Sequence, residues 1–185
     1  MIVAVKKENT FAVGVSISDS SIYMTERDLS LRSNLPFWKI KKVKGMYIGT
    51  KTLSFTTDLL RYNEQIFIDA IDTKSIVEKV IPKIKSLLVK YSLLINNREW
   101  DNQIVIIYNN RFFRITNFFE VDELDEYVIL GDDAFIKTSL DLSKNKSSSE
   151  RILNAVRDLC RMKNKQLFPL TVFNSANKIS KVYAR

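Results

Sequence analysis

The feature that most constrains the fold is the order in which two hydrophobic periodicities follow one another along the chain. Short runs of β-branched and aromatic residues, typical of strands, come in blocks, and amphipathic stretches typical of helices come in pairs between the blocks. The strand-like runs cover residues 2–6, 11–17, 22–25, 37–41, 46–49, 103–108, 111–115, 127–130 and 171–173. Single strands alternating with single helices would indicate a parallel βαβ protein, and this chain lacks that order. It predicts an α+β fold with two antiparallel sheets and helices outside them.

Residues that favour tight turns separate several of the neighbouring strands. Residues 8–10 predict a hairpin turn after the first run, and Lys44-Gly45 predict a second before the run at 46–49. Asn109-Asn110 forms a two-residue loop of the kind that accepts positive φ angles. We therefore expect β-hairpins at these three places.

Helical periodicity is clearest after Asp72, where apolar residues recur every three or four positions. This stripe consists of Ile76, Val80, Ile84, Leu87, Tyr91 and Leu94. Ser75 and Glu78 have the spacing of a capping box, and Pro82 predicts a kink or a late start. An earlier helix is expected with Ser54 as its N-cap, and its apolar face comprises Leu53, Leu59, Leu60 and Ile66.

Two more helices are expected before the last strand. One covers residues 134–142, and the other follows a second capping-box pair, Ser147 and Glu150. The apolar stripe of the latter comprises Ile152, Leu153, Val156, Leu159 and Cys160. Residues 174–185 are expected to be a basic, loosely packed tail. A chain of 185 residues is the size of one domain, which we place at residues 1–185, and it needs no disulfide or metal to bury a core.

The composition excludes several kinds of chemistry. The chain contains no histidine, so Ser-His-Asp and Cys-His catalysis and every histidine-containing zinc site are excluded. Cys160 is the sole cysteine, which excludes an intrachain disulfide and a Cys-x-x-Cys pair. No glycine-rich phosphate-binding motif occurs, and no cofactor or metal is expected. One thiol without a disulfide is typical of a reducing compartment, and we expect a cytoplasmic protein.

The charge balance leaves two interpretations open. Lys and Arg total 29 against 21 Asp and Glu, a formal net charge of +8, which fits either a polyanionic partner or a merely basic cytosolic protein. No apolar run approaches the roughly 20 residues that span a membrane, and Met1 leads into a strand-like run rather than a signal peptide.

Several segments in this order carry a resemblance to a known family. Ile2-Val3-Ala4-Val5-Lys6 looks like a first strand that directly follows a nucleophile, and Lys39 looks like a lysine that lowers the proton affinity of that nucleophile. Tyr47-Ile48-Gly49-Thr50 looks like the strand end and glycine turn that supply an oxyanion-hole amide. The chain from about Ile2 to Phe173 thus resembles the proteasome β-subunits and the simpler bacterial ring peptidases. The resemblance implies the N-terminal-nucleophile hydrolase fold, a four-layer αββα sandwich.

Two later segments extend the resemblance, and three positions depart from it. Residues 129–134 are similar to the glycine-containing entry to the family's third helix, and Asp158 lies where a late helix carries a supporting aspartate. Met1, however, stands where the second family residue would be, so the threonine nucleophile has no position. Ser16 replaces the aspartate that pairs with the lysine, and Asp132-Asp133 replace small residues. The departures predict a family fold without family chemistry.

The leading hypothesis is therefore a proteolytically inactive, proteasome-like subunit with a structural, scaffold or assembly role. The resemblance implies self-association into a dimer or ring through the outer helices, and another protein could also be a partner. A first alternative is a nucleic-acid-binding module whose surface comprises Arg32, Trp38, Lys39, Lys41, Lys42 and Lys44. A second alternative is an active peptidase whose native N-terminus differs from Met1.

Overall fold

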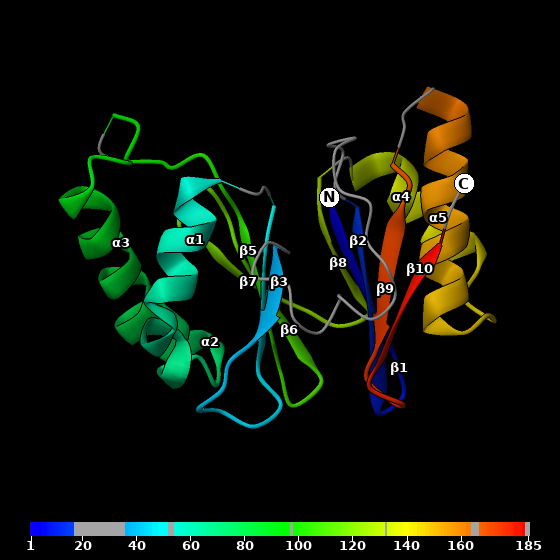
Figure 1. Ribbon diagram of the computed structural model, residues 1–185, viewed down its shortest axis with the longest axis horizontal. Coiled ribbons are helices and arrows are strands. Elements are labelled where there is room, and N and C mark those ends of the chain that lie inside the picture. The colour runs from blue at the N-terminus through cyan, green and yellow to red at the C-terminus, as the bar shows by residue number, and fades with distance from the viewer. Residues whose placement is uncertain (17–35, 52–53, 97, 132, 164–166, 184–185) are drawn as a thin grey trace. The chain divides into compact units, whose positions relative to one another are not determined.

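In the computed structural model the chain divides into two compact units (Figure 1). The structure describes residues 1–16, 36–51, 54–96, 98–131, 133–163 and 167–183. Unit one contains the described residues before 17 and from 126 onward, and unit two contains residues 36–125. The strand expected at 22–25, Arg32 and Asp132 lie outside the described residues. That residues 1–185 form one domain stays a prediction.

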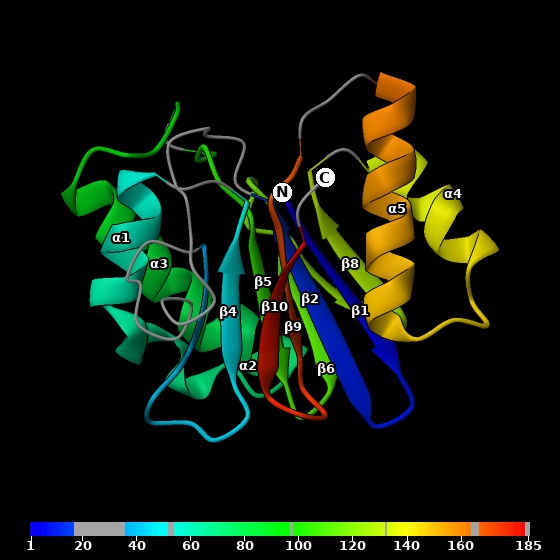
Figure 2. The same cartoon turned by 45° about the vertical axis from the view of Figure 1, so that its right-hand side comes forward.

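Unit one is a five-stranded antiparallel sheet covered on one face by two helices (Figure 2). Its strands, in the order β10-β9-β2-β1-β8, are β10 (Ile179–Tyr183), β9 (Leu170–Asn174), β2 (Thr10–Ser16), β1 (Ile2–Lys7) and β8 (Tyr127–Leu130). Its helices are α4 (Asp133–Leu142) and α5 (Ser148–Lys163). Val3 and Val5 point toward α5, where they join a buried cluster with Ile152 and Val156.

Unit two has the same plan with different helices. Its strands, in the order β3-β4-β5-β6-β7, are β3 (Phe37–Lys39), β4 (Tyr47–Thr50), β5 (Ile104–Tyr108), β6 (Arg111–Ile115) and β7 (Val121–Leu124). Its helical segments are α1 (Phe55–Tyr62), the 3₁₀ helix η2 (Glu64–Asp69), α2 (Thr73–Ser75), the π-helical turn η3 (Ile76–Val80) and α3 (Ile81–Lys90). Ile104 and Ile106 of β5 pack against these helical segments, in one buried cluster with Ile76 of η3 and Ile84 of α3.

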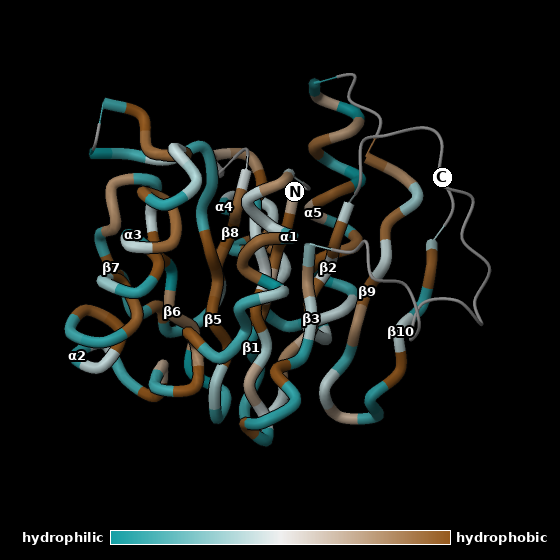
Figure 3. Tube along the Cα trace, turned by 60° about the vertical axis from the view of Figure 1, so that its left-hand side comes forward, coloured by the Kyte–Doolittle hydropathy of each residue, from teal (hydrophilic) through white to brown (hydrophobic). Residues whose placement is uncertain are grey.

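The central strands are apolar on both faces, which explains their continuous hydrophobic sequence. In β1, Val3 and Val5 join the helix-facing cluster, while Ile2 and Ala4 alternate with them and are also fully buried. In β5, Val105 and Ile107 are likewise buried on the face opposite Ile104 and Ile106. Figure 3 shows this as unbroken hydrophobic colouring along β5. A strand whose residues are buried on both faces has a continuous apolar sequence.

The predicted hairpins are confirmed at all three places. β1 pairs with β2, β3 with β4, and β5 with β6, each antiparallel. Glu8, Asn109 and Asn110 have positive φ angles at the turns, and Gly45 has φ +80°. The capping box at Ser147 is also confirmed, because Ser147 N–H donates to Glu150 Oε2 over 3.1 Å and Glu150 N–H donates to Ser147 Oγ over 3.3 Å.

Three predicted details are wrong. The capping box before α3 joins Asp72 and Ser75 rather than Ser75 and Glu78, because the helix begins three residues earlier and passes through the turn η3 before Pro82. The helix after Ser54 ends at Tyr62, so Ile66 belongs to η2 instead. Ser54 is the N-cap as predicted, although its side chain makes no capping bond, and Leu53 lies outside the described residues. The loose tail is a strand instead: β10 pairs with β9 along its whole length.

Within the described residues, no helix combines the length and the apolar character that crossing a membrane requires.

Candidate active-site positions

A reciprocal pair of backbone hydrogen bonds joins the start of β1 to the end of β2. The Met1 amino group donates to the Ser16 carbonyl over 3.0 Å, and the Ser16 N–H donates to the Met1 carbonyl over the same distance. This pair extends the ladder in which Ile2 faces Val15. Residue 1 therefore has a defined place at the end of the sheet, where its side chain packs against the core of unit one.

The Ser16 side chain, which replaces the expected aspartate, forms a structural bond. Ser16 is 3% exposed, and its hydroxyl donates to the carbonyl of Leu167 over 2.6 Å. Leu167 lies just before β9, so this bond joins the segment that leads into β9 to the end of β2. A neutral hydroxyl supplies no negative charge with which a catalytic lysine could pair.

Gly131 ends β8 in a conformation that favours glycine, with φ +141°. A Cβ at this position would lie 3.2 Å from Met1 Cγ, so the absence of a side chain leaves room for Met1. Met1, Ser16 and Gly131 thus meet at one end of the unit-one sheet. Threonine-peptidase chemistry needs a hydroxyl and an amine on one residue, whereas the Met1 side chain is a thioether that has no proton to lose.

Lys39 and Gly49 lie together on the β3–β4 hairpin of unit two. Gly49 faces Phe37 and Lys39 faces Tyr47 across the ladder. Lys39 is exposed, and the Phe37 ring stacks on Tyr47 with centroids 5.6 Å apart. Burial raises the pKa of Tyr47 because it disfavours the phenolate. The hairpin therefore presents Lys39 beside a neutral phenol.

Asp158 lies on α5 and bonds to the neighbouring helix. It accepts a hydrogen bond from the Ser139 hydroxyl on α4 over 2.6 Å. A second hydroxyl, on Ser143, donates to the Ser139 carbonyl over 2.8 Å. The bond to Ser139 gives Asp158 a role in holding α4 against α5.

The proposed nucleic-acid surface keeps its charges but loses its aromatic platform. Lys39, Lys41, Lys42 and Lys44 are all exposed. Trp38, on the opposite face of β3 from Lys39, packs against the unit-two core, and the Arg61 guanidinium lies 5.0 Å from its ring centroid. An indole covered in this way presents no open face on which a base could stack. Arg32, the remaining member, lies outside the described residues.

A buried polar cluster that sequence reasoning missed lies where β4, α1 and β5 meet. The hydroxyls of Thr50 and Thr57 share a hydrogen bond of 2.9 Å, and Asn102 Nδ2 donates to Thr57 Oγ1 over 3.3 Å. Thr56 donates to Asp101 over 3.2 Å. These bonds satisfy buried polar groups and fix the start of α1 to the sheet. Only the position of Asn102 directly before an apolar strand could have suggested a buried turn residue.

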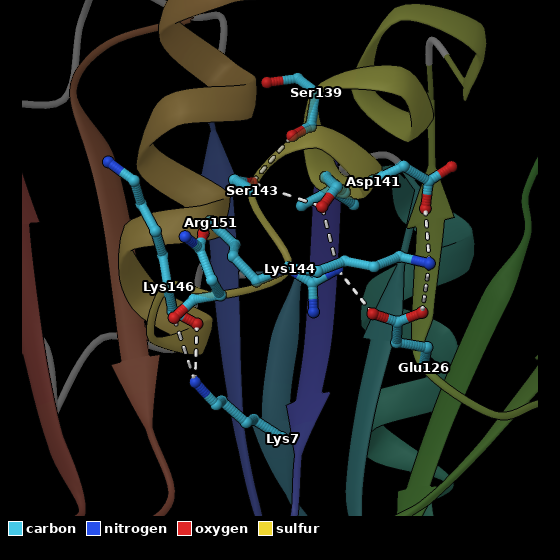
Figure 4. A network of polar contacts seen from close by, with 10 residues as sticks. Lys7, Glu126, Ser139, Asp141, Ser143, Lys144, Lys146 and Arg151 are labelled. Atoms are coloured by element: carbon cyan, nitrogen blue, oxygen red, sulfur yellow. Dashed lines mark hydrogen bonds and ion pairs between the residues drawn. The ribbon is translucent and has the colours of Figure 1, made fainter.

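A second missed network surrounds Arg151 in unit one (Figure 4). The Arg151 side chain is 2% exposed, and its Nη2 donates to Glu126 Oε1 over 2.7 Å and to the Leu140 carbonyl over 3.0 Å. Lys144 lies 3.8 Å from the other oxygen of Glu126. The network joins the end of α4, the start of α5 and the entry to β8. The apolar pattern around Arg151 gave no signal that its charge would be buried and paired.

Several of the acidic residues before β8 form ion pairs with basic residues. Arg114 pairs with Asp122 and Arg111 with Glu123, each between β6 and β7. Across the residues that the structure describes, no group of three metal-ligating side chains comes together.

Comparison with known proteins places this geometry in a fold. The sequence matches no family model and no curated protein. The structure is similar to BPH of Thiobacillus denitrificans in complex with epoxomicin, with a TM-score of 0.68 and 12% identity, covering 94% of this chain and 96% of that one. HslV of Trypanosoma brucei matches with a TM-score of 0.62 and 13% identity, covering 94% and 97%. Anbu of Yersinia bercovieri matches with a TM-score of 0.66 and 11% identity, covering 100% and 87%.

These likenesses extend over nearly the whole chain and show its fold. The protein has the proteasome β-subunit-like fold of the N-terminal-nucleophile hydrolases, an α+β fold with two five-stranded antiparallel sheets and helices. The predicted family resemblance and fold class are confirmed. At 11–13% identity the comparison shows the fold alone.

Proposed function

We propose that this protein is a proteolytically inactive, proteasome-like subunit that acts by self-association as a scaffold or assembly element. The observation that carries the proposal is the residue that stands directly before β1, which is Met1. Met1 is bound to Ser16 there and packs beside Gly131, and its thioether side chain supplies no nucleophilic hydroxyl at this end of the sheet. The fold, by contrast, is retained over 94–100% of the chain.

Two further features support the loss of chemistry. Ser16 is neutral and bonded to Leu167, so it provides no carboxylate to hold a catalytic lysine. Lys39 is exposed on its hairpin, and its cross-strand neighbour is Tyr47 rather than a carboxylate. Self-association follows from the family resemblance, since proteasome-like subunits work as assemblies. We also propose that the protein is cytoplasmic, in line with its single thiol.

The proposal is tested by activity, adduct formation and mass on one untagged preparation. We expect no hydrolysis of fluorogenic peptides and no covalent epoxomicin adduct by intact mass spectrometry. Thiobacillus denitrificans BPH, which forms a complex with epoxomicin, is the positive control. Turnover that disappears in Lys39→Ala, or a stoichiometric adduct, would contradict the proposal. An intact mass showing threonine or serine ahead of Ile2 would favour the active-peptidase alternative.

The assembly role is tested by the solution mass. Light scattering and native mass spectrometry are expected to find a discrete dimer or ring. A monomer at all concentrations would remove the scaffold role, and salt-sensitive DNA or RNA binding by that monomer would favour the nucleic-acid alternative.

A further inference from the structure

Charge is distributed unevenly between the two edges of the unit-two sheet. Residues 36–57 contain five lysines and no acidic residue. Residues 117–125 contain four acidic residues and no lysine or arginine. The first block contains edge strand β3 with its hairpin, and the second contains the opposite edge strand, β7. Four inter-strand spacings separate these edges, about 19 Å.

The lysines of the first edge have no acidic partner in the described structure. Lys41, Lys42 and Lys44 are exposed at the β3–β4 turn, and none of the described ion pairs includes them. We call this turn, residues 40–46, the lysine turn. Backbone hydrogen bonds between Ile40 and Met46 (3.0 Å) and between Met46 and Val43 (3.3 Å) brace it. Such a turn binds a complementary surface at a smaller entropy cost than a flexible tail.

The second edge has the opposite charge. Arg111 and Arg114 neutralise Glu123 and Asp122, which leaves Glu120 and Asp125 exposed at the two ends of β7 without a described ion pair. Phe118, 58% exposed, lies beside Glu120 and adds an apolar contact point. We call Phe118, Glu120 and Asp125 the acidic edge.

We propose that the lysine turn of one molecule binds the acidic edge of a second copy. This inference rests on the self-association proposed above and names its surfaces. The two surfaces lie on opposite edges of one sheet, so they are unable to meet within a molecule and are complementary only between copies. Contact between two different patches is head-to-tail, and repeated head-to-tail contact closes into a ring or continues as a filament. Charge complementarity here selects the partner and the register.

The features of the lysine turn favour a protein partner over nucleic acid. Its cations are lysines without an open aromatic face, because Trp38 is covered by Arg61. Nucleic-acid binding therefore becomes an outcome of the test.

The test is a charge swap in the full-length chain. One variant carries Lys41→Glu, Lys42→Glu and Lys44→Glu, and a second carries Glu120→Lys and Asp125→Lys. The matched control carries Lys137→Glu, Lys178→Glu and Lys181→Glu, which are exposed lysines of unit one. Each Lys→Glu substitution lowers the net charge by two, so the first variant and the control both have a net charge of 8 − 6 = +2. Sedimentation velocity at about 50 mM salt measures the association constant.

We expect the two swap variants each to associate about tenfold more weakly or worse, while the control stays within about twofold of the original chain. An equimolar mixture of the two swap variants should recover association. The acidic turn of the first variant is then complementary to the basic edge of the second, and the unchanged surfaces of the two variants remain complementary. Circular dichroism and the unfolding midpoint of every variant establish that each is folded.

Several outcomes would overturn the inference. If the lysine variant associates as its control does, the lysine turn is not the interface, although self-association itself stands. If the mixture fails to recover association, the acidic edge is not the occupant. If the lysine variant instead loses binding to single-stranded DNA, the occupant is nucleic acid. A wild-type chain that remains monomeric defeats the proposed function itself, a result distinct from all of these.

Discussion

At the scale of single residues, Gly14 shows how one missing side chain sets the distance between a helix and a sheet. Gly14 lies in β2 beneath α5, and a Cβ built there would collide with Cγ2 of Ile152. Ile152 is fully buried in the helix-facing cluster of unit one, so it has little space into which to move. Close packing makes such a collision costly.

We expect Gly14→Ala to lower the free energy of unfolding by about 1–3 kcal/mol, as overpacked core positions do. Urea denaturation measures the change. The substitution Ile152→Ala removes the Cγ2 atom, so the cost of alanine at position 14 should be smaller in that background. Equal costs in the two backgrounds would mean that the collision is not the cause.

Residue-scale features of this kind were the least predictable from the sequence. Gly14 looks like any small residue within a strand, and nothing near Arg151 indicates that its guanidinium will be buried against Glu126. Both depend on residues more than 20 positions away, which meet only in the folded chain. The Met1–Ser16 pair was different, because the register of a short hairpin follows from its turn.

At the scale of elements, the start of the long helix in unit two depends on a charged cap. Asp72 accepts a hydrogen bond from the Ser75 N–H over 2.7 Å, and the Ser75 hydroxyl completes the box. The bonds from the Ser75 backbone and side chain lower the pKa of the Asp72 carboxyl. A carboxyl whose pKa is lowered on folding stabilises the protein above its unfolded pKa, about 3.9, and this stabilisation is lost as pH falls through the folded value.

Two variants separate the charge of the cap from its hydrogen bond. Asp72→Asn should keep most of the stability at pH 7, because asparagine is also a good N-cap, and it should lose less stability than the original chain between pH 5 and 2. Asp72→Ala should be less stable already at pH 7. Thermal unfolding across this pH range tests both expectations. Identical pH dependence in Asp72→Asn and the original chain would show that Asp72 contributes nothing to acid unfolding.

Element prediction succeeded where one physical signal dominated and failed where two competed. Apolar runs and turn residues located the three hairpins, and the Ser147–Glu150 spacing located the start of α5. β7 was missed because acidic residues have low strand propensity, whereas here Arg111 and Arg114 pair with them across the sheet. β10 was missed because its composition resembles that of a loose tail, although pairing with β9 supports it.

At the scale of the whole molecule, head-to-tail contact predicts assemblies larger than a dimer. Two identical patches would stop at a dimer, but two different patches leave a free one on each end of a dimer. We therefore expect a concentration series to pass beyond a dimer to a ring or longer species. Native mass spectrometry follows the distribution. A population that stops at the dimer even at high concentration would require an isologous interface and would exclude the lysine turn with the acidic edge.

The fold was predictable from the order of elements because that order is a property of the entire chain. The candidate site was predictable only as a set of positions. The sequence predicted the two hairpins, β1–β2 and β3–β4, on or beside which Met1, Ser16, Lys39 and Gly49 lie, and the structure has both hairpins. The hydrogen bonds from Ser16 to Leu167 and from Ser139 to Asp158 depend on local geometry that no sequence motif encodes.

The division into two compact units also distributes the natural optical and chemical reporters. Both tryptophans, Trp38 and Trp100, belong to unit two, while the sole thiol, the half-buried Cys160 of α5, belongs to unit one. Indole fluorescence and thiol labelling rates therefore follow the two halves separately in the unmodified protein. Coincident denaturation curves from these two probes would establish a single cooperative transition, and staggered curves would reveal sequential melting.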